Sequence, residues 1–243
     1  MRIHVCIRST LDWRDPGLVQ ARILPEFRLK LEAWNATFNM PYHRFRQRVR
    51  EVAALNLSQV EGAVHSAIED VPPCDLIVPV DDDDWFAPDL ANRLQRAHEP
   101  RARCYLWSGD VIELPRRIRG SLQRLARLLG RKDRFICGTN NYAVVSEPAL
   151  VPLALNHVKA SRHFDPRPAD IKRVSGTLAI QNRTLASQTV LAWHRPSISR
   201  QELVTLLHRY RGLYGTHAVR PELSWARPYV AMMAELMREI HVR

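Results

Sequence analysis

The sequence predicts an α/β fold, in which a mostly parallel central sheet lies between layers of helices and further helices follow at the C-terminus. Short apolar runs alternate with segments of helical period along the chain. The clearest strand, residues 75–80, is a continuous apolar run between turn signals, which is typical of a strand buried within a parallel sheet. The 243 residues, 46% of them apolar, are sufficient for one large core.

The strands follow from apolar runs that turn residues bound. A first strand is expected at residues 3–7, before a polar loop. Later strands are expected at residues 103–107 and 111–114, around a turn at Ser108, Gly109 and Asp110. Further strands are expected within residues 135–145, at 176–180 and at 189–193.

The helices follow from apolar periodicity and from capping signals. Helical periodicity runs over residues 18–34, with an interruption at Pro25. Ser58 and Glu61 have capping-box spacing and predict a helix to about residue 69, and Pro88 opens another to about residue 98. Two helices at residues 199–213 and 227–241 complete the chain, the first opened by Ser199 and Glu202. We therefore expect a domain over residues 1–195 and a helical extension, 196–243, packed on it.

The chain carries a formal net charge of +11. This charge favours anionic partners such as nucleic acid, anionic lipid or phosphorylated small molecules, although a high arginine content also arises from genome composition. The four cysteines lie far apart without metal-finger spacing, as expected for reduced thiols in a cytoplasmic protein. No stretch approaches the roughly 20 apolar residues that span a membrane. We expect a cytoplasmic protein, either free or bound peripherally to a membrane.

Four consecutive aspartates, Asp81 to Asp84, follow the predicted strand at residues 75–80. Adjacent carboxylates repel one another, and a hard divalent ion such as Mg²⁺ or Mn²⁺ is a natural compensating charge. Ligands of open α/β sheets bind beyond the carboxyl ends of strands, which is where this aspartate run is expected. The alternative is a solvated acidic loop that caps the helix opened by Pro88.

The pattern strand-Asp-x-Asp-Asp-aromatic-x-x-Pro-Asp, ending at Asp89, resembles the DXD region of GT-A (Rossmann-like) glycosyltransferases. It is similar above all to family 2 and to rhamnosyltransferase-like bacterial proteins. The resemblance implies that Asp81 faces the nucleotide ribose or a metal-bound water. It implies that Asp83 binds the Mn²⁺ or Mg²⁺ ion that bridges the diphosphate, with Asp84 in support. Asp82 joins the nucleotide-sugar-binding candidates without a defined role.

Other segments resemble the same family in their order along the chain, and they add three groups of site residues. The loop after the first strand supplies the nucleotide-contact candidates Thr10, Asp12 and Arg14. The glycine-containing segment at 137–144 supplies the acceptor-side candidates Gly138, Asn140, Asn141 and Tyr142. A late strand ends in His194, which is expected to complete the metal site with Asp81 and Asp83.

The general base departs from the family pattern, because the usual Glu-Asp pair is missing between the glycine segment and the late strand. Asp165, Asp170 and Asp110 are the candidates for this role. An inverting enzyme needs such a carboxylate to accept the proton of the acceptor, whereas a retaining one does not.

The segment from Arg116 to Arg134 holds eight basic residues and one acid, Asp133. Its apolar stripe predicts an amphipathic helix, which either packs on the core with a solvated face, lies on anionic lipid, or contacts nucleic-acid phosphates.

The function expected from these features is metal-dependent transfer of a sugar from a nucleotide-diphosphate sugar to a polysaccharide, a lipid-linked acceptor or a modified nucleic-acid base. The alternatives are metal-dependent nucleotidyl or phosphoryl transfer, and nucleic-acid binding without catalysis.

Overall fold

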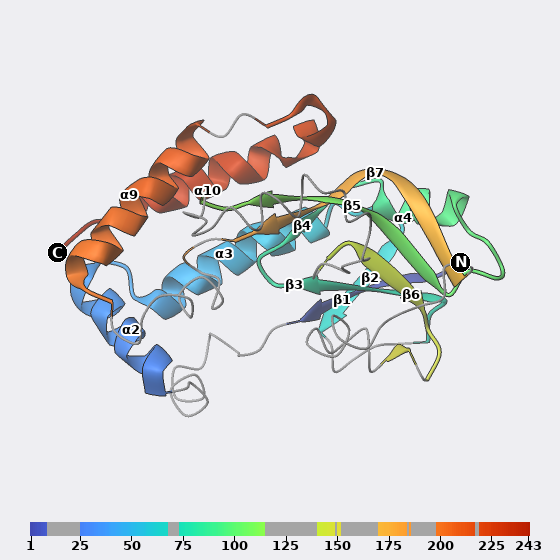
Figure 1. Cartoon of the computed structure of the whole chain (residues 1–243), viewed down its shortest axis with the longest axis horizontal. Helices are drawn as coiled ribbons and strands as arrows, with labels where there is room; N and C mark the ends of the chain where they lie inside the picture. Colours follow the sequence, from blue (N-terminus) through green and yellow to red (C-terminus); the bar gives the residue numbers. More distant parts are fainter. Residues whose placement is uncertain are drawn as a thin grey trace, which may run out of the picture.

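The computed structural model describes residues 1–8, 25–67, 73–114, 140–148, 150–151, 170–183, 185, 198–216 and 219–243. These residues form an α/β structure with one sheet, and the helices α2 and α9 gather at the end opposite the N-terminus (Figure 1). The sheet has seven strands in the order β2-β1-β3-β6-β5-β7-β4. The strands are β1 (Ile3–Arg8), β2 (Ala63–Ala67), β3 (Leu76–Asp81), β4 (Trp85–Phe86), β5 (Cys104–Ile112), β6 (Tyr142–Val145) and β7 (Ile171–Asn182).

The sheet is mixed, so the expectation of a mostly parallel sheet is not confirmed. Strand β1 pairs in parallel with β2 and β3, and β5 pairs in parallel with β7. The pairs β3–β6, β5–β6 and β4–β7 are antiparallel. The physical reason is the short strand β6, which inserts between β3 and β5 and runs against both. The α/β class itself is confirmed.

Most predicted strands are present, but the two strands expected at residues 103–107 and 111–114 form the single strand β5. The run at residues 75–80 is strand β3, whose first five residues are buried. Residues 103–107 and 111–114 do not flank a turn, because β5 continues through Ser108 and Gly109. Its register with β7 shifts on both sides of Ser108, which marks an irregularity of the bulge type that bends the strand.

The helices are α2 (Pro25–Thr37), α3 (Tyr42–Leu57), α4 (Leu90–Arg96), α9 (Arg200–Thr216) and α10 (Arg227–Glu239), with a 3₁₀ turn η2 (Pro221–Ala226) before α10. Helix α2 begins at Pro25, as the fixed φ of proline allows, and residues 18–24 of the expected helix lie outside the described residues. The capping box of α9 is confirmed. The amide of Ser199 donates to Glu202 Oε2 at 2.8 Å, and the amide of Glu202 donates to Ser199 Oγ at 3.2 Å.

The helix expected at residues 58–69 is wrong. Ser58 ends α3 instead of opening a helix, and its hydroxyl donates backwards to the carbonyl of Leu55 at 2.8 Å. Gly62 then adopts a φ of +76°, which breaks the helical path and leads into β2. The same Ser and Glu spacing therefore accompanies a helix end here and a helix start at Ser199.

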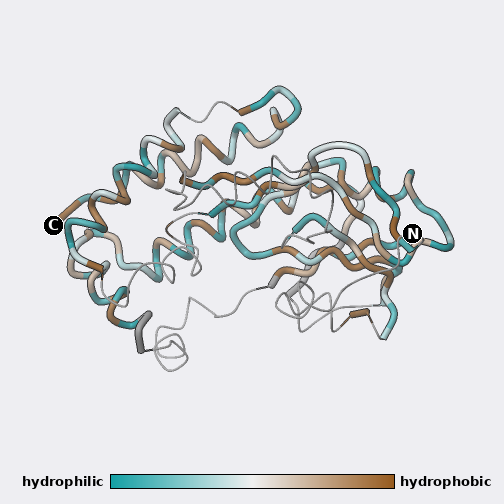
Figure 2. Tube along the Cα trace, in the orientation of Figure 1, coloured by the Kyte–Doolittle hydropathy of each residue, from teal (hydrophilic) through white to brown (hydrophobic). Residues whose placement is uncertain are grey.

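The apolar core consists of two main clusters. One lies among α2, α3, α9 and α10 and is centred on Trp34, which is fully buried and stacks on Phe45 with ring centroids 5.1 Å apart. The other joins β1, β3, β5 and β7 to α4. Figure 2 shows the hydrophobic stretches along the central strands and alternating hydropathy along the helices. Helix α3 contacts α2, α10 and β4 and so connects the helical cluster with the sheet.

Some expectations concern residues outside the described part, namely the strand at 189–193 and the basic segment at 116–134. The division into residues 1–195 and 196–243 stays a prediction. Within the described residues, none of the helices has the length and apolarity required to cross a membrane.

The conformation of Gly62 generates a test. Gly62→Ala is expected to lower the free energy of unfolding by about 1 kcal/mol, because a Cβ is disfavoured at positive φ. The site has space for the methyl group, since the nearest atom, Gln95 Nε2, is 4.0 Å from the added Cβ. Gly212→Ala, on the exposed side of α9 with nothing within 4 Å, is the matched control and is expected to stabilise by about 0.5–1 kcal/mol. Urea denaturation measures both, and equal effects would refute the backbone explanation.

Candidate functional site

The aspartate run forms a tight turn between β3 and β4. Asp81 is the last residue of β3, and the amide of Asp84 donates to the carbonyl of Asp81 at 3.1 Å. Asp82, Asp83 and Asp84 are only 5%, 7% and 4% exposed, while Asp81 is half-buried. Since three of the four carboxylates are buried, the alternative of a solvated acidic loop is wrong.

The turn lies where the topology of the sheet favours ligand binding. Strand β1 lies between β2 and β3, and both are parallel to it. After β1 the chain forms β2 on one side of β1 and then β3 on the other. Arg8, the last residue of β1, pairs in register with Asp81. In open α/β sheets the crevice beyond the carboxyl ends of two such strands is the usual ligand site.

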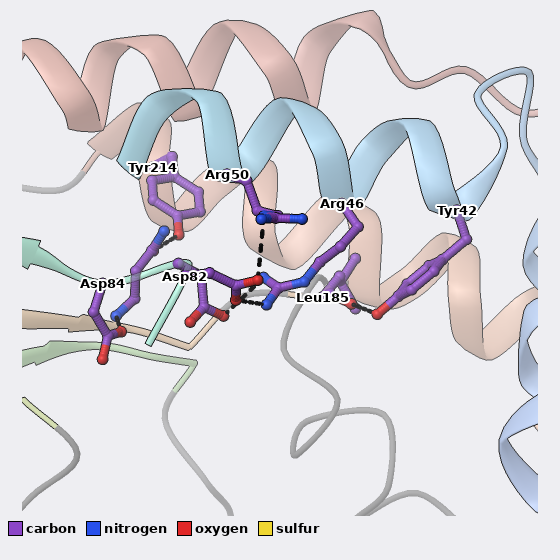
Figure 3. Close-up of polar contacts among 9 residues, drawn as sticks. Tyr42, Arg46, Arg50, Asp82, Asp84, Leu185 and Tyr214 are labelled. Atoms are coloured by element: carbon purple, nitrogen blue, oxygen red, sulfur yellow. Dashed lines mark hydrogen bonds and ion pairs between the residues drawn. The ribbon is translucent and has the colours of Figure 1, made fainter. Parts of the chain in front are cut away.

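Two arginines of α3 reach the aspartate run (Figure 3). Arg46 contacts Asp82 Oδ1 through Nη2, and its Nη1 lies 3.2 Å from Asp83 Oδ2. Arg50 Nε lies 3.3 Å from Asp82 Oδ2. The i, i+4 spacing places both arginines on one face of the helix. Sequence reasoning missed them, and that spacing was the available signal.

Burial and the neighbouring charges perturb the pKa of both partners of this ion pair. Burial raises the pKa of Asp83 to about 7, with Asp82 and Asp81 adding to the shift and Arg46 opposing it. Burial lowers the pKa of Arg46, but Asp83 and Asp82 outweigh it and hold that pKa above its usual range. Strongly perturbed pKa values occur at functional sites and also in structural ion-pair networks.

A second set of contacts holds the far end of the run. The backbone amide of Asn182, the last residue of β7, donates to Asp84 Oδ1 at 2.9 Å. The hydroxyl of Tyr214 on α9 in turn donates to Asn182 Oδ1 (Figure 3). Asp84 therefore has a structural role that links the turn to a C-terminal helix.

Helix α3 also fixes β4 directly. Asn56 is fully buried, its Nδ2 donates to the carbonyl of Phe86 at 2.9 Å, and the amide of Phe86 donates to Asn56 Oδ1 at 2.7 Å. One helix therefore supplies Arg46, Arg50 and Asn56 to the segment at residues 82–86.

A cavity of about 260 Å³ lies between α3 and the strand ends. Ile7 of β1, Asp82 and Arg50 line it together with other side chains of α3. The side chain of Arg50 is 31% exposed, whereas that of Arg46 is 8% exposed, so Arg50 is the guanidinium that this cavity offers.

Of the predicted acceptor-side residues, Asn140, Asn141 and Tyr142 lie at the start of β6. The antiparallel register of β6 with β3 places this start towards the carboxyl end of β3. Asn140 Nδ2 and Asn141 Oδ1 are buried and have no hydrogen-bond partner within the described residues. Tyr142 is a core residue, only 1% exposed.

The sheet separates the candidates for the general base. Asp110 of β5 pairs with Ile180 of β7, which pairs with Trp85, so Asp110 lies two strands, about 10 Å, from the end of the run. Its carboxylate binds Arg220 at 2.7 Å. Asp170 precedes β7 at the end opposite Asn182, roughly 35 Å of strand away, and is not brought to the run.

Several predicted site residues lie outside the described residues. They are Thr10, Asp12 and Arg14, the acceptor-side Gly138, the base candidate Asp165 and the metal-ligand candidate His194.

A divalent ion does not fit at Asp83, because the guanidinium of Arg46 lies against its carboxylate. Carboxylate oxygens suit Mg²⁺ or Mn²⁺, but the guanidinium of Arg46 already holds both Asp82 and Asp83. In the part of the chain that the structure describes, no three His, Cys, Asp or Glu side chains are grouped to hold a metal.

The chain has only weak similarity to known proteins. No family model and no curated protein matches the chain. Among solved structures, residues 1–349 of S. aureus TarS in complex with UDP-GlcNAc are 10% identical, with a TM-score of 0.32, over 98% of this chain and 72% of that chain. Another structure of the same TarS residues is 8% identical, with a TM-score of 0.29, over 98% of this chain and 71% of that one. At these TM-scores the likeness does not establish a shared fold.

The buried charge of Asp83 generates a prediction about stability. Folding raises the pKa of Asp83 from 3.8 to about 7, so ionisation destabilises the folded state increasingly as the pH rises through that interval. The free energy of unfolding of Asp83→Asn, relative to the wild type, is therefore expected to rise by a few kcal/mol between pH 4 and pH 8.

Thermal unfolding of both proteins from pH 4 to pH 8 measures this difference. Asp75→Asn is the matched control, because Asp75 lies at the opposite end of the same strand with its side chain 51% exposed. An Asp83→Asn effect that does not change with pH would contradict the electrostatic cause.

Proposed function

We propose that this protein transfers a sugar from a nucleotide-diphosphate sugar to an acceptor, and that the nucleotide binds at the carboxyl ends of β1 and β3. The observation that carries the proposal is the position of Asp81, at the end of β3 and in register with the end of β1. The adjoining cavity with Arg50 and the DXD-like sequence around Asp81 both support it.

Each side chain at the strand ends has a chemistry that suits this donor. The carboxylate of Asp81 accepts hydrogen bonds from vicinal hydroxyls such as those of a ribose. Arg50 offers a partly exposed guanidinium to a diphosphate, which gains negative charge as the sugar–phosphate bond breaks. Asp82 contacts both Arg46 and Arg50 and so orients them, and Asp83 contacts Arg46.

The resemblance to GT-A enzymes would put Mn²⁺ or Mg²⁺ on Asp81, Asp83 and His194. Because Arg46 already holds Asp83, the proposed transfer includes no metal ion at Asp83. Asp110 is our candidate for the general base of an inverting reaction, since the sheet places it nearer the run than Asp170.

The net charge of the chain bears on the acceptor, and the ion pair of Arg46 bears on the rival reaction. A net charge of +11 favours an anionic acceptor, whether a polysaccharide, a lipid-linked phosphate or nucleic acid. Two-metal nucleotidyl or phosphoryl transfer is less compatible with the site, because it needs free carboxylates where Arg46 is bound.

Isothermal titration with UDP, GDP and dTDP in the presence of Mn²⁺ tests the donor site. At least one of them is expected to bind, and Asp81→Asn is expected to weaken it at least about tenfold, through lost hydrogen bonds to the ribose. Asp75→Asn, at the other end of β3, is expected to leave the affinity unchanged.

Two results would refute the proposal. One is that none of the three nucleotides binds, and the other is that Asp81→Asn binds as tightly as the wild type. Release of pyrophosphate from a nucleoside triphosphate, without sugar transfer, would favour the rival reaction instead.

A further inference from the structure

Arg46 is the only buried arginine among those whose side chains the structure describes, with 6% of the residue exposed. Burying a guanidinium is costly unless carboxylates and hydrogen bonds compensate for its lost hydration. Asp82 and Asp83 provide that compensation. The reverse also holds, because these two buried carboxylates need a positive charge in contact with them.

The guanidinium contacts one oxygen of each carboxylate, Asp82 Oδ1 and Asp83 Oδ2. A divalent ion bound to Asp83 would lie within a few ångströms of this cation, and the two positive charges would repel strongly in a buried setting. Arg46 and a divalent ion at Asp83 therefore exclude each other.

Arg46 is also fixed to the fold. Its neighbours on α3, Phe45 and Val49, are both fully buried in the helical cluster, and Asn56 ties the same helix to Phe86. The positive charge at the aspartate run therefore belongs to the chain and does not exchange with the solvent as a bound ion would.

We propose that Arg46 is the resident cation of the aspartate run, holding Asp82 and Asp83 in place of a divalent metal ion. Removing its charge converts the two carboxylates into a site for Mn²⁺. This inference does not depend on sugar transfer. A consequence that does rest on the proposed function is that the nucleotide binds without a metal at Asp83, with Arg50 facing the diphosphate.

The decisive experiment compares the melting temperatures of variants with and without Mn²⁺. Arg46→Gln is expected to melt about 5–10 °C below the wild type, because it leaves two buried carboxylates unpaired. Millimolar Mn²⁺ is expected to recover about half of that loss in Arg46→Gln and to shift the wild type by less than about 1 °C. Arg48→Gln, on the exposed side of the same helix, is the matched control and should respond like the wild type.

Two further variants identify the ligands. Arg46→Lys keeps a positive charge and is expected to remain insensitive to Mn²⁺, whereas Arg46→Gln combined with Asp83→Asn is expected to lose the response. If the double variant responds as strongly as Arg46→Gln, or if the wild type responds as strongly, the proposal is overturned.

A measurement on the wild type keeps the proposal testable even if Arg46→Gln does not fold. Electron paramagnetic resonance of free Mn²⁺ reports binding directly, and the wild type and Asp83→Asn are expected to give the same signal. Mn²⁺ binding that Asp83→Asn weakens tenfold or more would overturn it.

Nucleotide titrations with and without the metal separate the two proposals. The nucleotide that binds to the wild type in Mn²⁺ is expected to bind in EDTA with an affinity within about threefold. If EDTA weakens binding to the wild type tenfold but does not weaken binding to Asp83→Asn, the metal lies on Asp83 and the Arg46 proposal is overturned. Failure of every nucleotide to bind counts against sugar transfer alone, since the Mn²⁺ responses of Arg46→Gln and the wild type still decide the role of Arg46.

Discussion

The ion pair between Arg46 and the carboxylates of Asp82 and Asp83 is the constraint on which the site depends. Burying the charged carboxylates of Asp82 and Asp83 side by side is costly, and Arg46 offsets that cost from a helix that is anchored in the aromatic cluster around Trp34. At the other end of the turn, Asn182 binds Asp84 and is itself held by Tyr214. The turn is thus fixed by α3 on one side and by β7 and α9 on the other.

Local signals in the sequence predicted a substantial part of this structure. The buried strand before Asp81 is present as β3, because a continuous apolar run between turn residues has few other stable environments. The capping box at Ser199 and Glu202 forms as expected, since both of its hydrogen bonds lie within four residues. The placement of the aspartate run at the carboxyl end of a buried strand followed from the same local pattern, whereas the pairing of that strand with β1 did not.

The remaining features depend on contacts that are distant in the sequence. Arg46 and Asp82 are 36 residues apart, and neither residue alone indicates the other. The antiparallel insertion of β6 between β3 and β5 is a matter of topology, which the apolar pattern of a strand does not encode. Ser58 has the spacing of a helix start but ends α3, because Gly62 at positive φ diverts the chain that follows.

The contact between Asn56 and Phe86 has a consequence for self-association. Strand β4 is the last in the order of the sheet, and an edge strand with free N–H and C=O groups invites pairing with another molecule. The amide and the carbonyl of Phe86 are both taken by the side chain of Asn56, while Ala87 bonds to Leu178 of β7 on the inner side. A single asparagine on α3 therefore closes this edge of the sheet and protects the turn from edge-to-edge aggregation.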